Sequence, residues 1–354
     1  MQKDDGGLMN YLYYLLVAVP VAVYLELTHA SPLLIFVFSS LAIIPLAGLM
    51  GKSTEELAIV AGPRVGGLLN ATFGNATELI ITIFALKEGL FDVVKASIAG
   101  SILGNILLVL GFAAFLGGIK NKTLQFNYQI ANLNTSLLFL VVVALIIPAM
   151  FYHAGDLDSA EAQTLSLITA ILLITIYVTS LYFSFKSHRH LFHTSHNVLE
   201  KAEWNKYVSL AVLAGSVVLV ALMSEFLVGS LEHMVQQVGV SEIFIGFILI
   251  PIIGNAAEHS TAVLMAIKNR MDLALEIAVG SSTQIALMIT PLLVFISYLF
   301  GKPMHLIFHQ LELTGIALAV LVVNFAIRDG ETNYLEGLIL LFTYVILGTA
   351  FYFV

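Results

Sequence analysis

Residues 74–80 read GNATELI and place a glutamate, Glu78, inside an apolar run, where an ionised carboxylate is expensive unless something pairs with it. Residues 254–260 read GNAAEHS, and the two blocks match at Gly, Asn, Ala and Glu. The second glutamate, Glu258, lies in the other half of the chain. Two costly carboxylates in matching surroundings indicate a repeated unit with a function.

The composition shows where these blocks lie. Of 354 residues, 59% are hydrophobic and 11% are charged, whereas soluble domains carry about 25% charged residues. Apolar segments of about 20 residues, enough to cross a hydrocarbon core of about 30 Å, recur along the whole chain. We therefore predict an all-α membrane protein with eleven transmembrane helices and the lipid bilayer as its surroundings, at about 9–29, 32–50, 64–87, 92–119, 132–152, 162–185, 206–232, 241–268, 272–300, 303–325 and 334–354.

The loop charges orient these spans. With eleven spans, the loops on one side hold twelve Lys and Arg residues and those on the other side hold three. Positive residues collect on the cytoplasmic side of membrane proteins. We expect a multi-pass protein of a bacterial cell membrane, with its N-terminus in the cytoplasm and its C-terminus outside.

This topology runs the two blocks in opposite directions, because five spans separate them. Inverted repeats of this kind are typical of secondary transporters. The chain then divides into an N-terminal transmembrane helix at 1–30, a first five-helix repeat at 31–185, a cytoplasmic His-rich linker at 186–205, and a second five-helix repeat at 206–354.

The following spans extend the match. AGSILGN at 99–105 and VGSSTQ at 279–284 align Ser101 with Ser281, and each serine follows its glutamate at the same spacing. The register then slips, so that treating Asn105 and Gln284 as equivalents is a functional inference rather than an alignment.

Each block lies where its helix is expected to break. Gly74 weakens the first helix, and Pro251 removes a backbone donor shortly before Gly254 in the second. Both breaks would lie near the bilayer midplane, where unwound backbone is tolerated only inside the protein or beside a wet cavity. Carbonyl oxygens near Gly74 and Gly254 would then be free to bind a cation.

A structural alternative exists for both blocks. Asn-x-x-Glu is also a capping pattern, in which Asn caps a helix start and Glu reaches back to the backbone. A neutral cap would cost less at mid-membrane, since a charge at the helix centre costs roughly 2.5–3.5 kcal/mol. Two inverted copies therefore favour a function over capping alone.

The residue types favour a hard cation. Ca²⁺ takes six to eight oxygen ligands, and the core offers carboxylate, amide, carbonyl and hydroxyl oxygens from Glu78, Glu258, Asn75, Asn255, Gly74, Gly254, Ser101 and Ser281. The chain has no cysteine, and His259 is the one histidine candidate in the core, which argues against zinc or copper.

Charge balance favours exchange. Two carboxylates neutralise one divalent ion when ionised, and they are neutral themselves when each holds a proton. Protons and metal would compete for the same groups, which is antiport. His259, next to Glu258, is a candidate for proton coupling, with a hydrogen-bonded structural histidine as the alternative reading.

The paired blocks, with GSILGN and GSSTQ in the next spans, resemble the repeat motifs of the cation/proton exchanger family, the Ca²⁺/H⁺ antiporters of the Ca²⁺/cation antiporter superfamily. The resemblance runs from about residue 50 through the last span. It implies Glu78 and Glu258 as shared Ca²⁺ and H⁺ sites, with Asn75, Asn255, Asn105 and Gln284 as polar residues of the core. The Thr- and Ser-rich motifs of sodium/calcium exchangers are absent, which disfavours Na⁺ coupling.

We therefore predict a secondary active transporter that exchanges Ca²⁺ for H⁺ by alternating access. Its partners are calcium ions and protons, with no cofactor and no nucleic acid, and its oligomeric state stays open. Alternatives are an exchanger coupled to Na⁺ or selective for another divalent ion such as Mn²⁺, and a passive cation channel. An enzyme is not expected, because His-Glu-x-x-His, Gly-x-Gly-Asp and Gly-x-Ser-x-Gly are all absent from the sequence.

Other polar residues receive weaker assignments. Glu225 and Glu312 lie inside predicted spans and are candidates for a cation or proton path, or else interfacial residues. Asp92, Asp272 and Glu276 lie near span ends, where solvation is expected. The stretch SHRHLFHTSH at 187–196 is either a solvated linker or a sensor of metal or pH.

Overall fold

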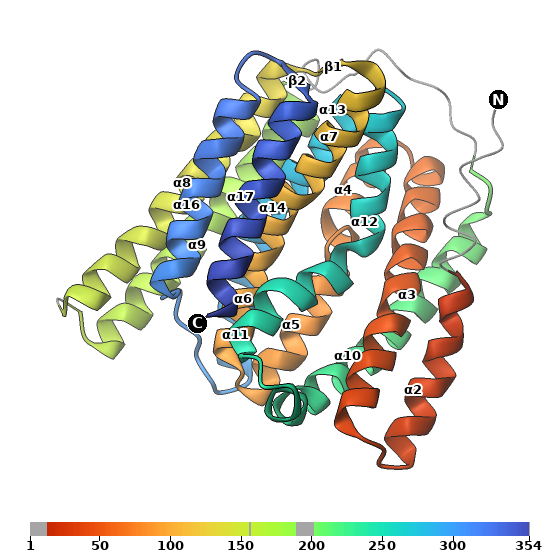
Figure 1. The fold of residues 1–354 in the computed structure, drawn as a ribbon, viewed down its shortest axis with the longest axis vertical. Coiled ribbons are helices and arrows are strands. Elements are labelled where there is room, and N and C mark those ends of the chain that lie inside the picture. The colour runs from red at the N-terminus through yellow and green to blue at the C-terminus, as the bar shows by residue number, and fades with distance from the viewer. Residues whose placement is uncertain (1–12, 156, 189–201, 354) are drawn as a thin grey trace.

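The computed structural model describes residues 13–155, 157–188 and 202–353, and nearly all of them are helical (Figure 1). The first half contains η1 (Tyr14–Val17), α2 (Ala18–Leu27), α3 (Pro32–Ala61), α4 (Pro63–Phe73), α5 (Ala76–Glu88), α6 (Phe91–Leu103), η2 (Gly104–Val109), α7 (Leu110–Asn121), β1 (Thr123–Gln125), α8 (Tyr128–Ala154), α9 (Ser159–Tyr182) and η3 (Phe183–Ser187). The second half contains α10 (Lys206–Val238), α11 (Glu242–Phe244), η5 (Ile245–Leu249), α12 (Ile250–Ile267), α13 (Met271–Leu275), η6 (Glu276–Gly280), α14 (Ser281–Gln284), η7 (Ile285–Ile289), α15 (Thr290–Leu299), α16 (Gln310–Ala326), β2 (Glu331–Asn333) and α17 (Tyr334–Tyr352). Except for η1, a 3₁₀ turn, the η elements are π-helical turns within longer helices.

Nine helical segments of the described chain are long and apolar enough to cross a membrane. Two shorter apolar helices, Tyr14–Leu27 and Gln310–Ala326, lie at the predicted first and tenth spans. The predicted start of the tenth span at 303 was wrong. Residues 302–309 are extended, and serines from neighbouring helices accept their backbone N–H groups: Ser297 Oγ from Met304 N and Ser166 Oγ from Leu306 N, both at 2.9 Å.

The predicted break in the first motif is confirmed, and the one in the second is wrong. α4 ends at Phe73 and α5 begins at Ala76, with Gly74 and Asn75 between them. α12 instead continues from Ile250 to Ile267 through Gly254. Pro251 lies in the first turn of α12, directly after the π-helical turn η5, so the helix widens without unwinding. Gly254 therefore has helical backbone, and its carbonyl is not freed by a break.

Backbone features recur at the spacing of the two motifs. The connection after α5 turns left-handed at Gly89 (φ 91°), and the connection after α12 does so at Asn269 (φ 61°), at the same interval in the sequence as Glu78 and Glu258. The helices that follow begin at Phe91 and Met271, again at this interval. Figure 1 places the α5–α6 connection and the α12–α13 connection at opposite ends of the molecule.

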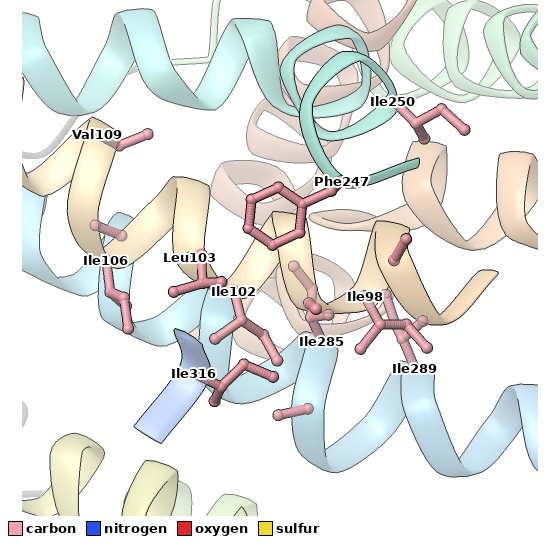
Figure 2. Packing of buried hydrophobic residues seen from close by; sticks show 14 of the residues in the cluster. Ile98, Ile102, Leu103, Ile106, Val109, Phe247, Ile250, Ile285, Ile289 and Ile316 are labelled. Atoms are coloured by element: carbon pink, nitrogen blue, oxygen red, sulfur yellow. The ribbon is translucent and has the colours of Figure 1, made fainter. Parts of the chain in front are cut away.

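Close helix contacts join the two halves. Phe247 of η5 points toward α6, beside Ile98, Ile102 and Leu103 (Figure 2), and its ring stacks on Phe351 of α17 at 3.6 Å between centroids. At the other end, α7 packs against α17, and β1 pairs antiparallel with β2, with Leu124 opposite Thr332. These contacts hold α6, which carries Ser101, and α7 against the second half.

Candidate cation site

Glu78 lies in the first turn of α5 and is 3% exposed. Its carboxylate packs over Gly254 of α12, where an added Cβ would lie 2.9 Å from Glu78 Oε1. That oxygen has no hydrogen-bond partner among the described residues. The glycine of one motif thus makes room for the carboxylate of the other.

Three further polar contacts cross between the halves. Asn75 Nδ2 donates to Gln284 Oε1 at 2.7 Å, and Asn255 Nδ2 lies 3.4 Å from Ser101 Oγ. His259 Nε2 lies 3.3 Å from Asn105 Oδ1. Each contact joins a motif residue of one half to a residue in the following helix of the other half.

One contact stays within the second half. Ser281 Oγ donates to Glu258 Oε2 at 2.9 Å. Gly74 lies beside Gln284, whose Oε1 would be 3.7 Å from a Cβ at residue 74. Each residue that the sequence placed in the cation or proton site thus takes part in at least one of these contacts.

Three buried oxygens in this group have no hydrogen-bond partner in the described structure: Glu78 Oε1, Asn75 Oδ1 and Asn255 Oδ1. A buried acceptor without a partner costs about 1–3 kcal/mol, and more when it is charged. Carboxylate and amide oxygens are the ligands that Ca²⁺ prefers. The described residues contain no group of three or more His, Cys, Asp or Glu side chains that could hold a metal ion, so a cation bound here would need the amide oxygens as ligands. The donor set therefore fits a hard cation.

The capping alternative is wrong for both motifs. Asn75 is the N-cap residue of α5, but its side chain makes no capping hydrogen bond. Asn255 lies inside α12, whose N-cap is Leu249. Real capping boxes occur elsewhere in this chain, for instance at Asp158 with Glu161 and at Asn333 with Glu336. The side chain of Asn75 instead reaches Gln284 in the other half, and Asn255 Nδ2 donates to Pro251 O at 3.1 Å within α12 and lies 3.4 Å from Ser101 Oγ of the other half.

The two carboxylates differ in exposure. Glu78 is buried, whereas Glu258 and His259 are partly exposed and Thr261, one turn further along α12, is exposed. On α4, Asn70 is exposed as well. The more exposed side of the site therefore lies toward the end of the molecule that carries the α12–α13 connection.

The remaining acidic candidates lie outside these contacts. Glu312 is 2% exposed and its Oε2 accepts from His309 N at 2.7 Å, which caps α16. Glu225 is exposed on α10. Of the His-rich stretch 187–196, all but the first two residues lie outside the described residues.

Sequence reasoning missed a buried lysine. Lys95 was counted among the loop residues, but it is 7% exposed inside α6. Its Nζ lies 3.1 Å from Asp92 Oδ1 and donates to Ile307 O at 3.1 Å, so it holds the extended segment 302–309 against α6. Its place three residues after Asp92, on one helix face, was the signal available in the sequence.

Comparisons with known proteins agree with this geometry. The family model described as sodium/calcium exchanger protein matches residues 31–186 and 208–353. A Ca²⁺/H⁺ antiporter of Aphanothece halophytica is 45% identical, with 97% of each chain covered. The Ca²⁺/H⁺ antiporter ChaA of Bacillus subtilis (strain 168) is 44% identical, covering 97% of this chain and 99% of the relative.

A solved structure has the same fold. The structure of native YfkE superposes with a TM-score of 0.86 at 42% identity, covering 97% of this chain and all of that one. The family match spans both halves of the chain, including both motifs and the helices that follow them. This chain belongs to the sodium/calcium exchanger protein family.

Proposed function

We propose that this chain exchanges Ca²⁺ for H⁺ across a membrane, with Glu78 and Glu258 shared between the two substrates. The observation that carries the proposal is the group of contacts that brings both glutamates together with oxygens lacking partners. The relatives named as Ca²⁺/H⁺ antiporters, which are similar over nearly the full length, support the same substrates.

The chemistry follows from charge. Ca²⁺ approaching from the open side meets the Glu258 carboxylate first, because Glu258 is partly exposed and Glu78 is buried. Oxygens of Glu78, Asn75 and Asn255 then complete the site from the closed side. Gln284 holds Asn75, Ser101 contacts Asn255, and Ser281 holds Glu258, while Asn105 contacts His259. Protonation of both carboxylates removes the charge that holds the ion and releases it.

In this proposal, His259 assists proton coupling because of where its ring lies. Its ring lies next to Glu258 in the chain, and Nε2 contacts Asn105 at the open side of the site. A ring that exchanges protons with water can pass them to the neighbouring carboxylate. In this proposal His259 assists Glu258 and does not bind the ion.

We also propose the eleven-helix architecture that the sequence predicts. The two shorter apolar helices cross the membrane with the nine longer ones, and 31–185 and 206–354 are inverted five-helix repeats after an N-terminal helix at 1–30. The left-handed turns and helix starts that recur at the spacing of the two glutamates support this arrangement. With 186–205 as a cytoplasmic linker, the N-terminus lies in the cytoplasm and the C-terminus outside, in a bacterial cell membrane.

Transport in proteoliposomes tests the exchange. Purified protein should take up Ca²⁺ when a pH gradient is imposed, and uptake should persist without Na⁺. Equal uptake with the pH gradient collapsed and Na⁺ supplied would support the sodium-coupled alternative. Uptake that follows the Ca²⁺ gradient and ignores pH would support a channel.

Orientation has its own test. The chain has no cysteine, so single cysteines can be introduced without background. Cysteine at Lys122 should react with an impermeant reagent only from the cytoplasmic side, and cysteine at Ala160 only from outside. Labelling of both positions from the same side would overturn the topology.

A further inference from the structure

Two extended segments lie at corresponding places in the two halves of the chain. Residues 123–127 follow α7 and residues 303–307 follow α15, at the same interval as the two motifs. Leu124 and Met304 occupy corresponding positions in these segments, and both are buried. Figure 1 places the two segments at opposite ends of the molecule. Each segment contacts the half to which it does not belong.

The chain entering each segment is attached to the end of a motif helix in the other half. Just before the first segment, Asn121 Nδ2 lies 3.4 Å from Ile267 O, at the end of α12. Just before the second, Lys302 Nζ donates to Lys87 O at 2.9 Å, in the last turn of α5. Ile267 and Lys87 again correspond in the sequence. Both attachments therefore lie on the last turn of the helix that carries a site glutamate.

Each segment ends on the helix that follows the motif helix. Asp272, in the first turn of α13, accepts a hydrogen bond from Asn127 N at 2.6 Å through Oδ1. Its counterpart Asp92, in the first turn of α6, lies 3.1 Å from Lys95 Nζ. Lys95 in turn donates to the carbonyl of Ile307, the counterpart of Asn127. An acid in the first turn thus holds the segment in both halves, directly at Asp272 and through a lysine at Asp92.

The attachment at Asp272 braces the two helices that carry the second-half site residues. Glu258 lies in α12, and Ser281 in α14 donates to its Oε2 at 2.9 Å. α13, η6 and α14 follow one another within a single apolar helical segment that begins at Met271. The place of the first turn of this segment therefore affects where Ser281 lies relative to α12.

We propose that Asp272 is a positioning residue of the cation site. Its hydrogen bond to Asn127 N fixes the start of α13, and the fixed helix keeps Ser281 against Glu258. The inference rests on the proposed function, in which Glu258 binds Ca²⁺. The alternative is that Asp272 only stabilises the helix start, because a negative charge in the first turn interacts favourably with the helix dipole. The two roles differ in that the dipole needs a charge, whereas the hydrogen bond needs an acceptor oxygen.

Ca²⁺ binding by the purified full-length protein tests this role. Asp272→Ala should raise the Ca²⁺ concentration for half-maximal binding about tenfold, the lower end of the loss when a supporting contact of a metal site is removed. Asp272→Asn keeps an acceptor oxygen and should bind nearly like the wild type. The matched control Asp158→Ala removes an acid that caps α9, and it should lower the unfolding temperature without changing Ca²⁺ binding. Wild-type binding by Asp272→Ala, or an equal loss in Asp272→Asn, would overturn the proposal.

A double variant shows whether Asp272 acts through Ser281. Ser281→Ala alone should weaken Ca²⁺ binding, but it should add little in the Asp272→Ala background, whereas independent residues add their effects. Additive losses would reject the positioning role and leave the proposed function intact. Wild-type Ca²⁺ binding by both Ser281→Ala and Glu258→Gln would instead reject the Ca²⁺ role of Glu258, and this inference with it.

The backbone partner provides a test that leaves Asp272 in place. Asn127 has a φ of −71°, which proline adopts without strain. Asn127→Pro and Asn127→Ala both remove the side chain that caps α8, but only proline also removes the N–H that Asp272 accepts from. Asn127→Pro should therefore weaken Ca²⁺ binding, and Asn127→Ala should not. Equal Ca²⁺ binding by the two variants would reject the proposal, even if Asp272→Ala does not fold.

Discussion

The two motif helices share Gly, Asn, Ala and Glu at corresponding positions and yet differ in shape. The first breaks at Gly74 and Asn75 between α4 and α5, and its glutamate is buried. The second continues through Gly254 and Asn255 in α12, and its glutamate is partly exposed. The same residues can therefore occupy two conformations, and the difference between the halves reflects which end of the site is open.

If Glu78 and Glu258 bind Ca²⁺ and protons as a pair, replacing either one should abolish exchange to a similar extent, although Glu78 is buried and Glu258 is partly exposed. Glu78→Gln and Glu258→Gln should each reduce Ca²⁺/H⁺ exchange at least about a hundredfold, equivalent to about 2.8 kcal/mol at 1.4 kcal/mol per factor of ten. Both variants should fold, because a neutral amide costs less than a carboxylate at this depth. Uptake into proteoliposomes and thermal unfolding of the same preparations provide the check. Loss of exchange in only one variant would mean that the halves have different roles.

The two motif glycines, Gly74 and Gly254, should not be equally important for exchange. Gly254→Ala puts a Cβ 2.9 Å from Glu78 Oε1 and displaces the carboxylate. Displacements of about 1 Å cost up to about a hundredfold in function, so we expect a tenfold to hundredfold loss of exchange. Gly74→Ala places its Cβ 2.7 Å from the backbone oxygen of Asn70 and away from either carboxylate, so any loss should come from a shift of the break between α4 and α5 and not from the carboxylates. The Ca²⁺ concentration for half-maximal uptake should therefore rise in Gly254→Ala, and an unchanged value there would show that the Gly254–Glu78 contact is unimportant.

The serines provide a smaller contrast. Ser281→Ala removes a hydrogen bond to ionised Glu258, worth roughly 1.5–3 kcal/mol for a charged partner. Protons should then compete better with Ca²⁺, so that half-maximal binding at a given pH needs more Ca²⁺. Ser101→Ala loses only a 3.4 Å contact with Asn255 and should change binding less. Binding titrations at two pH values decide this, and the reverse order would contradict the geometry.

The smallest expected effect concerns two asparagines, Asn75 and Asn127, and is measured as a change in thermal stability. In a Gln284→Ala background, which already lacks the partner of Asn75 Nδ2, Asn75→Ala should leave the unfolding temperature nearly unchanged, because the side chain caps nothing. Asn127→Ala is the matched control, since Asn127 Oδ1 accepts from Gln129 N and Ile130 N at the start of α8. Removing such a cap costs about 1 kcal/mol. A larger loss of stability in Asn75→Ala than in Asn127→Ala would restore the capping interpretation.

The residues that contact one another around Glu78 and Glu258 could be selected from the sequence, because charge inside an apolar run and repetition at a fixed spacing are both visible there. The break at Gly74 was predictable for the same reason. The continuity of α12 was not, because Pro251 can end a helix or occupy its first turn, and only the π-helical turn before it decides between these. The burial of Lys95 depends on the carbonyl of Ile307, which lies in the other half of the chain. The unequal exposure of Glu78 and Glu258 depends on which conformation the molecule adopts, and two equivalent motifs carry no information about that.

The most direct test of a site shared by both substrates is proton release on Ca²⁺ binding. Ca²⁺ is added to purified protein in weakly buffered solution with a pH indicator, at a pH where the carboxylates are partly protonated. Wild-type protein should release protons in proportion to bound Ca²⁺, and Glu78→Gln should bind Ca²⁺ weakly and release fewer. Tight Ca²⁺ binding by the wild-type protein without proton release would contradict the shared site.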